Sequence, residues 1–238
     1  MFLEIIIFVI FVLILLEIIS APIEWLWPCS MGGSTVWRGD KHQKVVSLTF
    51  DDGPSEYTDE ILDILKRRKI HATFFVIGSN VHSYVETVKR IVSEGHEIGN
   101  HTFSFQSKRW ILKFFYPIKK SQVYKNQEIL KEISGKNVEF YRSPGLQMGR
   151  GLLRTVHSCN LKVINGTFPF PNPRGDSDHQ LKVAMKSVKP GAIVILHDGD
   201  DHNPGSKRPK ATVSLLPLLL DHLDKQGYEV KPLSYTAH

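Results

Sequence analysis

The stretch Lys44-Val-Val-Ser-Leu-Thr-Phe-Asp-Asp-Gly-Pro54 decides the fold. After Lys44 its residues are mostly apolar or β-branched, which predicts a buried β-strand over 44–50. The next four residues, Asp51-Asp52-Gly53-Pro54, are typical of a turn. Apolar side chains at helical spacing follow, in a helix that we expect Thr58 to cap. The stretch therefore opens a strand–turn–helix unit that has two adjacent carboxylates in its turn.

Strands and helices alternate along the rest of the chain. The same patterns predict further strands over residues 71–77, 97–100, 138–141, 162–164, 192–196 and 228–230. Helices are expected over residues 81–94, 118–134, 152–159, 180–188 and 212–226, and loops over 167–178 and 198–208. Strands separated by helices of this length predict parallel βαβ units, in an open α/β sheet or a barrel.

Length and composition narrow the class of protein. The 238 residues are enough for one well-filled domain. Hydrophobic residues make up 42% and charged residues 23%, which is typical of a globular protein and excludes a disordered chain. The net charge of +6 comes from basic residues that are scattered or in short groups such as 66–69. We therefore expect a solvated cationic surface, no nucleic-acid partner and a monomer.

The first residues, 1–27, form a hydrophobic leader. Residues 2–19 are nearly all Ile, Leu, Val and Phe, but the run free of glutamate, 5–16, is shorter than the roughly 20 residues of a spanning helix. A signal peptide, which here would lack its positive start, and an uncleaved membrane anchor both remain open. Both send the chain into the secretory route, to the cell surface, the cell wall or the exterior. An N-terminal arm, 28–43, precedes a domain over 44–238.

Two cysteines are too few for a disulfide scaffold or a four-cysteine zinc module. In an oxidising compartment, Cys29 and Cys159 either bridge the arm to the domain or stay as free thiols. Two stretches match the N-glycosylation sequon, Asn165-Gly-Thr167 and Asn100-His-Thr102. The second lies in a motif that we expect to be buried, so it is discounted.

Polar side chains follow four of the expected strands. They are Asp51 and Asp52, Asn100 and His101, Arg142, and His197 and Asp198. In such folds the functional residues gather at the carboxyl ends of the strands. Carboxylates, two histidines and an arginine at one rim can together hold a divalent cation, a general base and a general acid. Each residue alone has an ordinary structural explanation, so their convergence is what indicates a site.

Four motifs, in order, resemble those of polysaccharide deacetylases, the NodB-homology group or carbohydrate esterase family 4, which includes chitin deacetylases. They are Thr49-Phe-Asp-Asp-Gly-Pro54, Gly95-His-Glu-Ile-Gly-Asn-His101, Arg142-Ser-Pro-Gly145 and Ile195-Leu-His-Asp198. The resemblance covers the chain from about Val45 to its end. It implies a distorted (β/α) barrel with fewer than eight strands, in agreement with the alternation of elements.

The resemblance also implies a role for each matching charged residue. Asp51 would be the general base that activates a metal-bound water, and Arg142 would hold it ionised and oriented. Asp52 and His101 would be ligands of a divalent metal, with zinc as the expected ion. His197 would protonate the departing sugar amine.

Two further residues are expected to contact the substrate. The resemblance implies that the Gly145 N–H faces the developing oxyanion and that Leu196 lines the slot for the acetyl methyl group. The implied reaction is hydrolysis of N-acetyl groups on an acetylated glycan, such as chitin or another N-acetylglucosamine polymer.

The sequence departs from the family pattern in two places. The family has a second metal-binding histidine four residues after the first, and here that position is Phe105, which has no lone pair to donate. Catalytic zinc normally has three protein ligands, so the metal site is expected to be weakened. A further motif of the family, expected between Gly145 and Ile195, falls on residues 163–176, where the usual Trp is absent and the spacing differs. Asp176 is the candidate for the acid that tunes the catalytic histidine, and Phe168 or Phe170 for an apolar wall.

Two hypotheses follow from this pattern. The first is a metal-assisted deacetylase of N-acetylglucosamine polymers with a compromised metal site, supported by Asp51, Asp52, Arg142 and His197. The second is a catalytically impaired relative that binds a glycan or has a structural part at a cell surface or wall, supported by Phe105. A membrane contact through the leader is expected only if the leader stays uncleaved.

Overall fold

The structure is a computed structural model that describes Glu4 and residues 35–104, 118–146, 150–169, 185, 188–200 and 207–237. Its strands are β1 (Thr35–Val36), β2 (Val45–Asp51), β3 (Thr73–Val76), β4 (Glu97–Asn100), β5 (Phe140–Tyr141), β6 (Lys162–Ile164), β7 (Phe168–Pro169), β8 (Ile193–His197) and β9 (Glu229–Val230). Its helices are α2 (Thr58–Arg68), α3 (Gly78–Val81), α4 (Val85–Ser93), α5 (Lys120–Ser134), α6 (Arg150–Ser158), α8 (Arg208–Lys225) and α9 (Leu233–Thr236), with a 3₁₀ turn at Pro144–Leu146.

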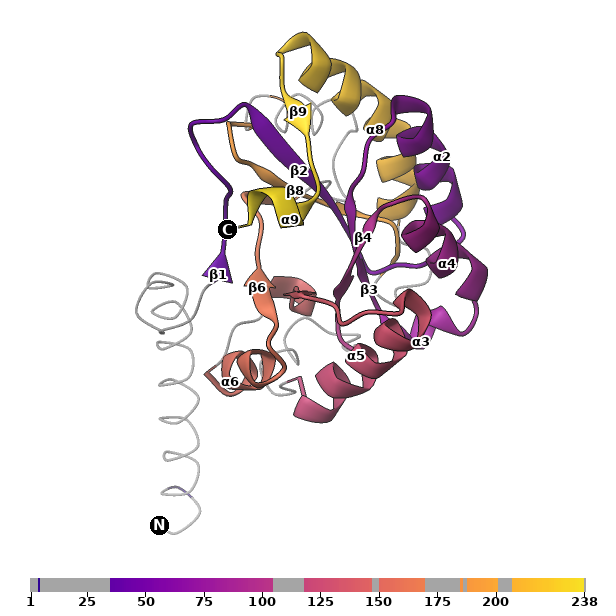
Figure 1. Cartoon of the computed structure of the whole chain (residues 1–238), viewed down its shortest axis with the longest axis vertical. Helices are drawn as coiled ribbons and strands as arrows, with labels where there is room; N and C mark the ends of the chain where they lie inside the picture. The colour runs from indigo at the N-terminus through magenta and orange to yellow at the C-terminus, as the bar shows by residue number, and fades with distance from the viewer. Residues whose placement is uncertain are drawn as a thin grey trace.

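The strands form one parallel sheet that curls into a half-barrel (Figure 1). Their order is β1-β6-β5-β4-β3-β2-β8-β7, and β9 pairs with the start of β2. β6 and β7 belong to one run of residues, 162–169, so the eight strands of this order come from seven runs of chain in the part that the structure describes. The expected distorted barrel with fewer than eight strands is therefore confirmed.

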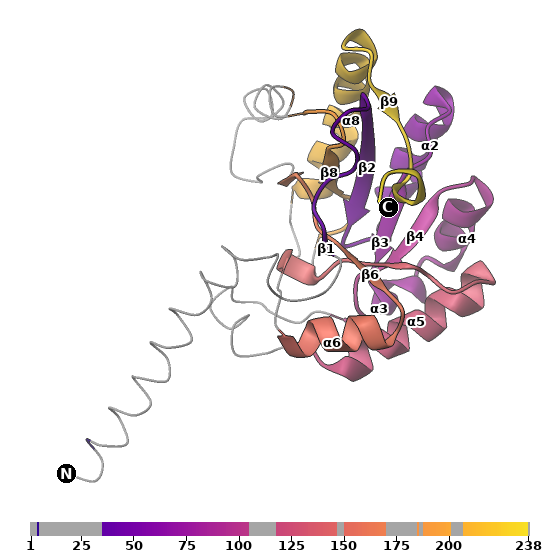
Figure 2. The same ribbon diagram turned by 60° about the vertical axis from the view of Figure 1, so that its left-hand side comes forward.

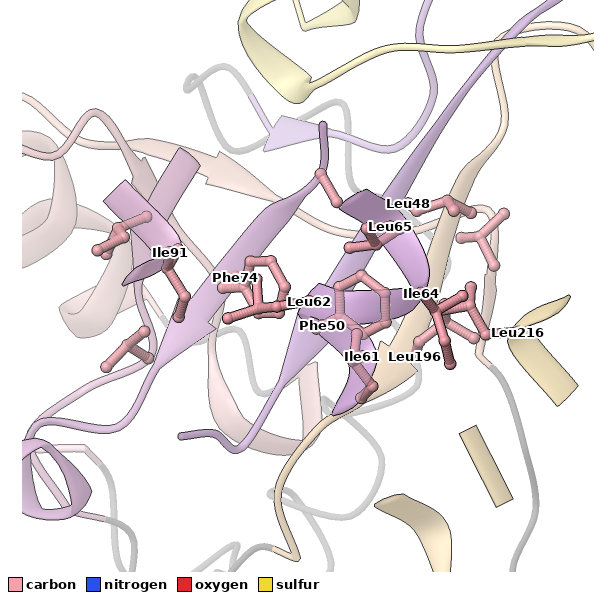
Figure 3. Packing of buried hydrophobic residues seen from close by; sticks show 14 of the residues in the cluster. Leu48, Phe50, Ile61, Leu62, Ile64, Leu65, Phe74, Ile91, Leu196 and Leu216 are labelled. Atoms are coloured by element: carbon pink, nitrogen blue, oxygen red, sulfur yellow. The ribbon is translucent and has the colours of Figure 1, made fainter. Parts of the chain in front are cut away.

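Helices cover the outer face of the sheet. Neighbouring helices follow one another in the order α8, α2, α4, α5 and α6, as both views of the ribbon show (Figures 1 and 2). The main core lies between the sheet and these helices, and its centre is a stack of Phe50 on Phe74 with ring centroids 4.8 Å apart (Figure 3). Alternate residues of β2, such as Leu48 and Phe50, face this core, because successive strand residues point to opposite faces.

The inner face of the sheet has its own core. Phe75, Phe140, Ile164, Ile193, Leu233 and Ala237 form this cluster. The last helix, α9, lies against the amino-terminal ends of the strands, where the Leu233 N–H donates to Thr73 Oγ1 at 3.3 Å and Glu97 accepts from the Ser234 N–H. The amino-terminal end of the barrel is therefore filled by α9 and this inner core.

Most of the expected elements are present, with a few corrections. The helix expected over 81–94 begins only at Val85, because its N-cap Tyr84 has a non-helical backbone with φ −136°, and Val81 belongs to the preceding short helix α3. Residue 57, not Thr58, is the N-cap of α2, and Thr58 Oγ1 accepts instead from the Ser55 N–H at 2.8 Å. The helix expected over 180–188 lies almost entirely outside the described residues.

The N-terminal arm takes part in the fold. Its residues 35–36 form β1 and pair with β6, and the Gly39 N–H donates to the Gly191 carbonyl. Apart from Glu4, the leader lies outside the described residues. No helix within the described residues is long and apolar enough to cross a membrane.

Candidate active site

The carboxyl ends of β2, β4, β5 and β8 bring the expected polar residues together. Asp51 pairs with His197 across β2 and β8, so these two side chains leave neighbouring strands at the same level and on the same face. His101 follows β4, and Arg142 follows β5. The parallel register thus confirms that Asp51, Asp52, His101, Arg142 and His197 lie at one rim.

Arg142 is completely buried and holds Asp51 in place. Its Nη1 donates to Asp51 Oδ1 at 2.7 Å and to Thr49 Oγ1 at 2.6 Å. Its Nε and Nη2 donate to the carbonyls of Ile164 and Asn165. With four hydrogen bonds from one rigid fork, the guanidinium fixes the orientation of the carboxylate.

Asp52 and His101 face each other at the same rim. Asp52 Oδ1 lies 3.2 Å from His101 Nε2, and both side chains are buried. The other ring nitrogen, Nδ1, lies 2.8 Å from the Arg142 carbonyl, which only accepts hydrogen bonds. The ring must therefore carry a proton on Nδ1. Nε2 then faces the carboxylate with a lone pair, unless a second proton or a cation lies between them.

Burial and neighbouring charges shift the pKa of Asp52 and the pKa of His101 in opposite directions. Burial alone would lower the pKa of His101, but the charges of Asp51 and Asp52 and a hydrogen bond to Asp52 raise it overall. Burial alone would raise the pKa of Asp52, but His101 and the more distant charges of His197 and Arg208 lower it overall. Both shifts favour a positive charge between the two side chains, supplied by a proton or by a cation.

The donor set of Asp52 and His101 fits a divalent cation. Two donors that each lie about 2.0–2.1 Å from a tetrahedral zinc ion are about 3.3 Å apart, close to the 3.2 Å observed here. Histidine ligands usually donate their other ring N–H to a carbonyl, as Nδ1 does to Arg142. Among the described residues, however, no group of three or more His, Cys, Asp or Glu side chains is arranged to hold a metal. Phe105 lies outside those residues.

His197 lies at the open side of the rim. Its Nε2 is 4.0 Å from Asp52 Oδ2, and its side chain keeps 14% of its surface exposed. It is therefore the most accessible of the rim's titratable side chains described above, which suits a group that exchanges protons with a bound molecule.

Leu196 does not lie at the rim, which corrects the expectation from the sequence. It packs in the outer core, opposite Phe50 of β2 (Figure 3). Ile195 pairs instead with Thr49, on the face that carries Asp51 and His197. Strand alternation places every second residue on the same face, so Ile195 is the apolar side chain below His197.

Of the other residues expected at the site, Gly145 and Phe168 are among the described residues. Gly145 is exposed at the 3₁₀ turn that follows Arg142, with φ 63°, a left-handed conformation that glycine adopts without strain. Asp176 and Phe170 lie outside the described residues, and Phe168 belongs to β7. Their expected roles remain predictions.

Neither glycosylation sequon is accessible in the fold. Asn100 and Asn165 are both fully buried, the former within a hydrogen-bond network with α5 and the latter with its carbonyl bound to Arg142. Cys159 is a half-buried free thiol. Its proposed partner Cys29 lies outside the described residues.

Sequence reasoning assigned no role to Asp198, which is nevertheless part of this rim. Its carboxyl group is buried, and burial raises its pKa to about 7, against the opposing effect of the hydrogen bond from Thr58 and with smaller contributions from the charges of Asp52 and Asp51. Its position directly after His197 was the only signal in the sequence.

The fold and this set of rim residues define a barrel hydrolase site of the kind that the motifs implied. A model of the polysaccharide deacetylase family matches residues 38–164, and the chain belongs to that family. A peptidoglycan-N-acetylglucosamine deacetylase of Bacillus cereus is 32% identical over 213 residues, covering 85% of this chain and 92% of the relative. A chitooligosaccharide deacetylase of Bradyrhizobium sp. is 31% identical, covering 79% of this chain and 88% of the relative.

Solved structures show the same fold. A peptidoglycan N-acetylglucosamine deacetylase superposes with a TM-score of 0.75 and 27% identity, covering 91% of this chain and 96% of the other. A mutant of a carbohydrate esterase family 4 pseudoenzyme from Bacillus anthracis, with restored enzymatic activity, superposes with a TM-score of 0.71 and 26% identity, covering 87% of this chain and 72% of the other. The structural neighbours thus include both an enzyme and a pseudoenzyme.

Proposed function

We propose that this protein is a metal-assisted deacetylase that removes N-acetyl groups from N-acetylglucosamine polymers, with a weakened metal site. The observation that carries the proposal is the buried Arg142–Asp51 pair beside Asp52, His101 and His197. Burying these charges costs stability that a purely structural rim could avoid with apolar residues. Their retention together is what a hydrolytic site requires.

Each side chain has a distinct part in the proposed reaction. Asp51, held by Arg142, accepts a proton from the attacking water. His197 donates a proton to the nitrogen of the amide as the bond to the acetyl carbon breaks. Acetate and a free amine are the products. A divalent cation at Asp52 and His101 would polarise the acetyl carbonyl and make the water more acidic.

Zinc is the cation that this donor set suits best. One carboxylate and one imidazole are common zinc ligands. The two described donors are one fewer than the three that catalytic zinc sites usually provide, and Phe105 occupies the position where the family has a further histidine. We therefore propose that zinc binds weakly and that water completes its coordination.

The substrate class is proposed from the relatives. Relatives with about 30% identity are named for peptidoglycan or chitooligosaccharide deacetylation. Both substrates contain N-acetylglucosamine, so the shared chemistry is an acetamide on a sugar polymer. Chitin and peptidoglycan glycan strands are thus both suitable test substrates. With a hydrophobic leader, the protein would meet such a polymer at the cell surface, in the wall or outside the cell.

Acetate release tests the proposal. The chain without its leader is incubated with N-acetylglucosamine oligomers or with peptidoglycan, in excess zinc or cobalt. Asp51→Asn is the blank, because it keeps the shape of the side chain but removes the base. We expect release above the blank from at least one substrate, and release equal to the blank from both would contradict the proposal.

A second candidate function is a glycan-binding relative without chemistry. The loss of the ligand at Phe105 and the pseudoenzyme among the structural neighbours favour it. Binding of the oligomers by a folded protein that releases no acetate would select this alternative.

A further inference from the structure

Asp198 is a buried carboxylate next to His197 that the proposed reaction does not use. It is 1% exposed. Its Oδ2 accepts a hydrogen bond from Thr58 Oγ1 at 2.8 Å, and among the described residues its Oδ1 has no hydrogen-bond partner. A buried carboxyl group with one partner is costly, so its presence calls for a physical explanation.

The backbone around Asp198 is bonded to the turn that carries the two site carboxylates. The N–H groups of Asp198 and Gly199 both donate to the Asp51 carbonyl, at 3.1 and 3.3 Å. In return, Ser55 Oγ donates to the Asp198 carbonyl. Together with the bond from Thr58, these contacts join both ends of the turn to the end of β8.

The Asp198 carboxyl group also occupies the space beside Gly53. A Cβ atom at Gly53 would lie 1.9 Å from Asp198 Oδ2, so the turn has no room for a side chain there. Asp52, the residue before Gly53, has φ 71°, a left-handed conformation that costs free energy for a residue other than glycine. Such a conformation persists only when its surroundings hold it, and the Asp198 carboxyl group lies directly against the next residue of the turn, Gly53.

We propose that Asp198 is a positioning residue that holds the turn 51–55 in the conformation which presents Asp51 and Asp52 to the site, in register with His197. Asp198 acts through these neighbours and does not touch the substrate. The inference rests on the proposed function, because it assigns the conformation of the turn to metal binding and proton transfer. It explains why the turn contains glycine and why a threonine begins α2.

The test compares two buried threonines that each donate a hydrogen bond to a carboxylate. Thr58 donates to Asp198 at 2.8 Å, and Thr87 of α4 donates at 2.9 Å to Asp59 of α2, which is not a rim carboxylate. Thr58→Val and Thr87→Val each remove one such bond with little change of shape, and Thr58→Val also removes the bond that Thr58 Oγ1 accepts from the Ser55 N–H in the turn. Zinc affinity is measured by titration, the geometry of the bound ion by the absorption spectrum of cobalt(II), and folding by thermal unfolding.

We expect zinc to bind Thr58→Val about tenfold more weakly than the parent, with a changed cobalt spectrum, by analogy with other outer-shell losses. Thr58→Ser, which restores the hydroxyl, should recover most of the affinity, and Thr87→Val should match the parent. If Thr58→Val does not fold, Ser55→Ala becomes the deciding variant, because it removes the side-chain bond from the turn to the Asp198 carbonyl.

Equal zinc affinity and equal spectra in the deciding variant and the parent would overturn the inference, whether or not the protein releases acetate. A loss of affinity in Thr58→Val that Thr58→Ser does not recover would overturn it too. A parent that binds zinc with the expected pattern but releases no acetate would contradict only the proposed function. A parent that binds no zinc would overturn both.

Discussion

The guanidinium of Arg142 is completely buried, and the Asp51 carboxylate at 2.7 Å balances its charge. Two backbone carbonyls and Thr49 take its remaining hydrogen bonds, and the guanidinium carbon lies 4.2 Å from the centroid of the Phe75 ring. A lysine in this position would be a point charge without the planar fork. The pair therefore depends on arginine in particular.

Removal of Arg142 should destabilise the protein mainly through Asp51. Arg142→Ala leaves a buried carboxylate without its counter-charge, and such losses cost about 3–5 kcal/mol in the free energy of unfolding. Asp51→Asn in the same background should restore part of that stability, because the uncompensated charge is gone. Urea denaturation of the single and double variants measures both effects. A double variant less stable than Arg142→Ala would contradict this explanation.

The sequence predicts the charged rim residues well but not which apolar side chain accompanies them. Motif order identifies Asp51, Asp52, His101, Arg142 and His197, because these types are rarely found together at strand ends without a function. The expected place of Leu196 at the site is wrong. Which residues of β8 face the site depends on the register of β8 against β2, and that register pairs Ile195 with Thr49. Asp198 was overlooked since its role comes from contacts with a turn far away in the sequence.

Away from the site, the buried side chain of His96 joins two neighbouring strands and has a shifted pKa. Between β3 and β4, His96 Nδ1 accepts the Ala72 N–H at 3.1 Å, and the ring packs edge-on against Phe74 and His71. Burial, with a smaller effect of the charges of His71 and Arg90, lowers the pKa of His96 to about 4. The imidazole is therefore neutral in the folded protein at neutral pH.

This histidine should make stability depend on pH. The unfolded chain, with an ordinary histidine pKa near 6.5, binds the proton more readily than the folded protein between pH 4 and 6.5. Stability should consequently fall as the pH is lowered through that window, by up to about 3 kcal/mol from this group. His96→Asn, whose Oδ1 can still accept the Ala72 N–H, should flatten the dependence. A variant with the parent's pH profile in thermal unfolding would show that His96 is not responsible.

The type and order of the longer elements could be predicted from periodicity alone, and β4 and β6 have the expected bounds, but the short elements β1, α3, β7 and α9 were not expected. The first turn of α2 and the division between α3 and α4 could not. Thr58 has the composition of a cap, but its hydroxyl bonds to Ser55 and Asp198, a partner 140 residues away. Tyr84 has a non-helical backbone before α4, in a stretch whose apolar spacing continues without a break.

The barrel interior is filled by side chains of α9 at the amino-terminal ends of the strands. Leu233 of α9 is fully buried among side chains from β3, β5, β6 and β8 on the inner face of the sheet. This packing leaves the polar rim at the opposite end of the strands as the place for chemistry. The closing helix comes from the last residues of the chain, and its short apolar stretch gave no sequence signal.

Truncation of Leu233 should therefore affect global stability. Leu233→Ala opens a cavity in the barrel interior and should cost about 2–5 kcal/mol in the free energy of unfolding. Leu218→Ala is the matched control, because Leu218 lies on α8 with 46% of its surface exposed. Its effect should stay within about 0.5 kcal/mol. Equal losses in the two variants would mean that α9 does not seal a packed core.

The proposed function requires that the metal site at the rim lacks one ligand, at the position of Phe105. The most direct test is the zinc affinity of Phe105→His against the parent, with Phe105→Ala as the control that removes the ring without adding a donor. We predict that zinc binds Phe105→His at least about tenfold more tightly than the parent, while Phe105→Ala matches the parent. Equal affinity in Phe105→His and Phe105→Ala would contradict the assignment of Asp52 and His101 as ligands of an incomplete metal site.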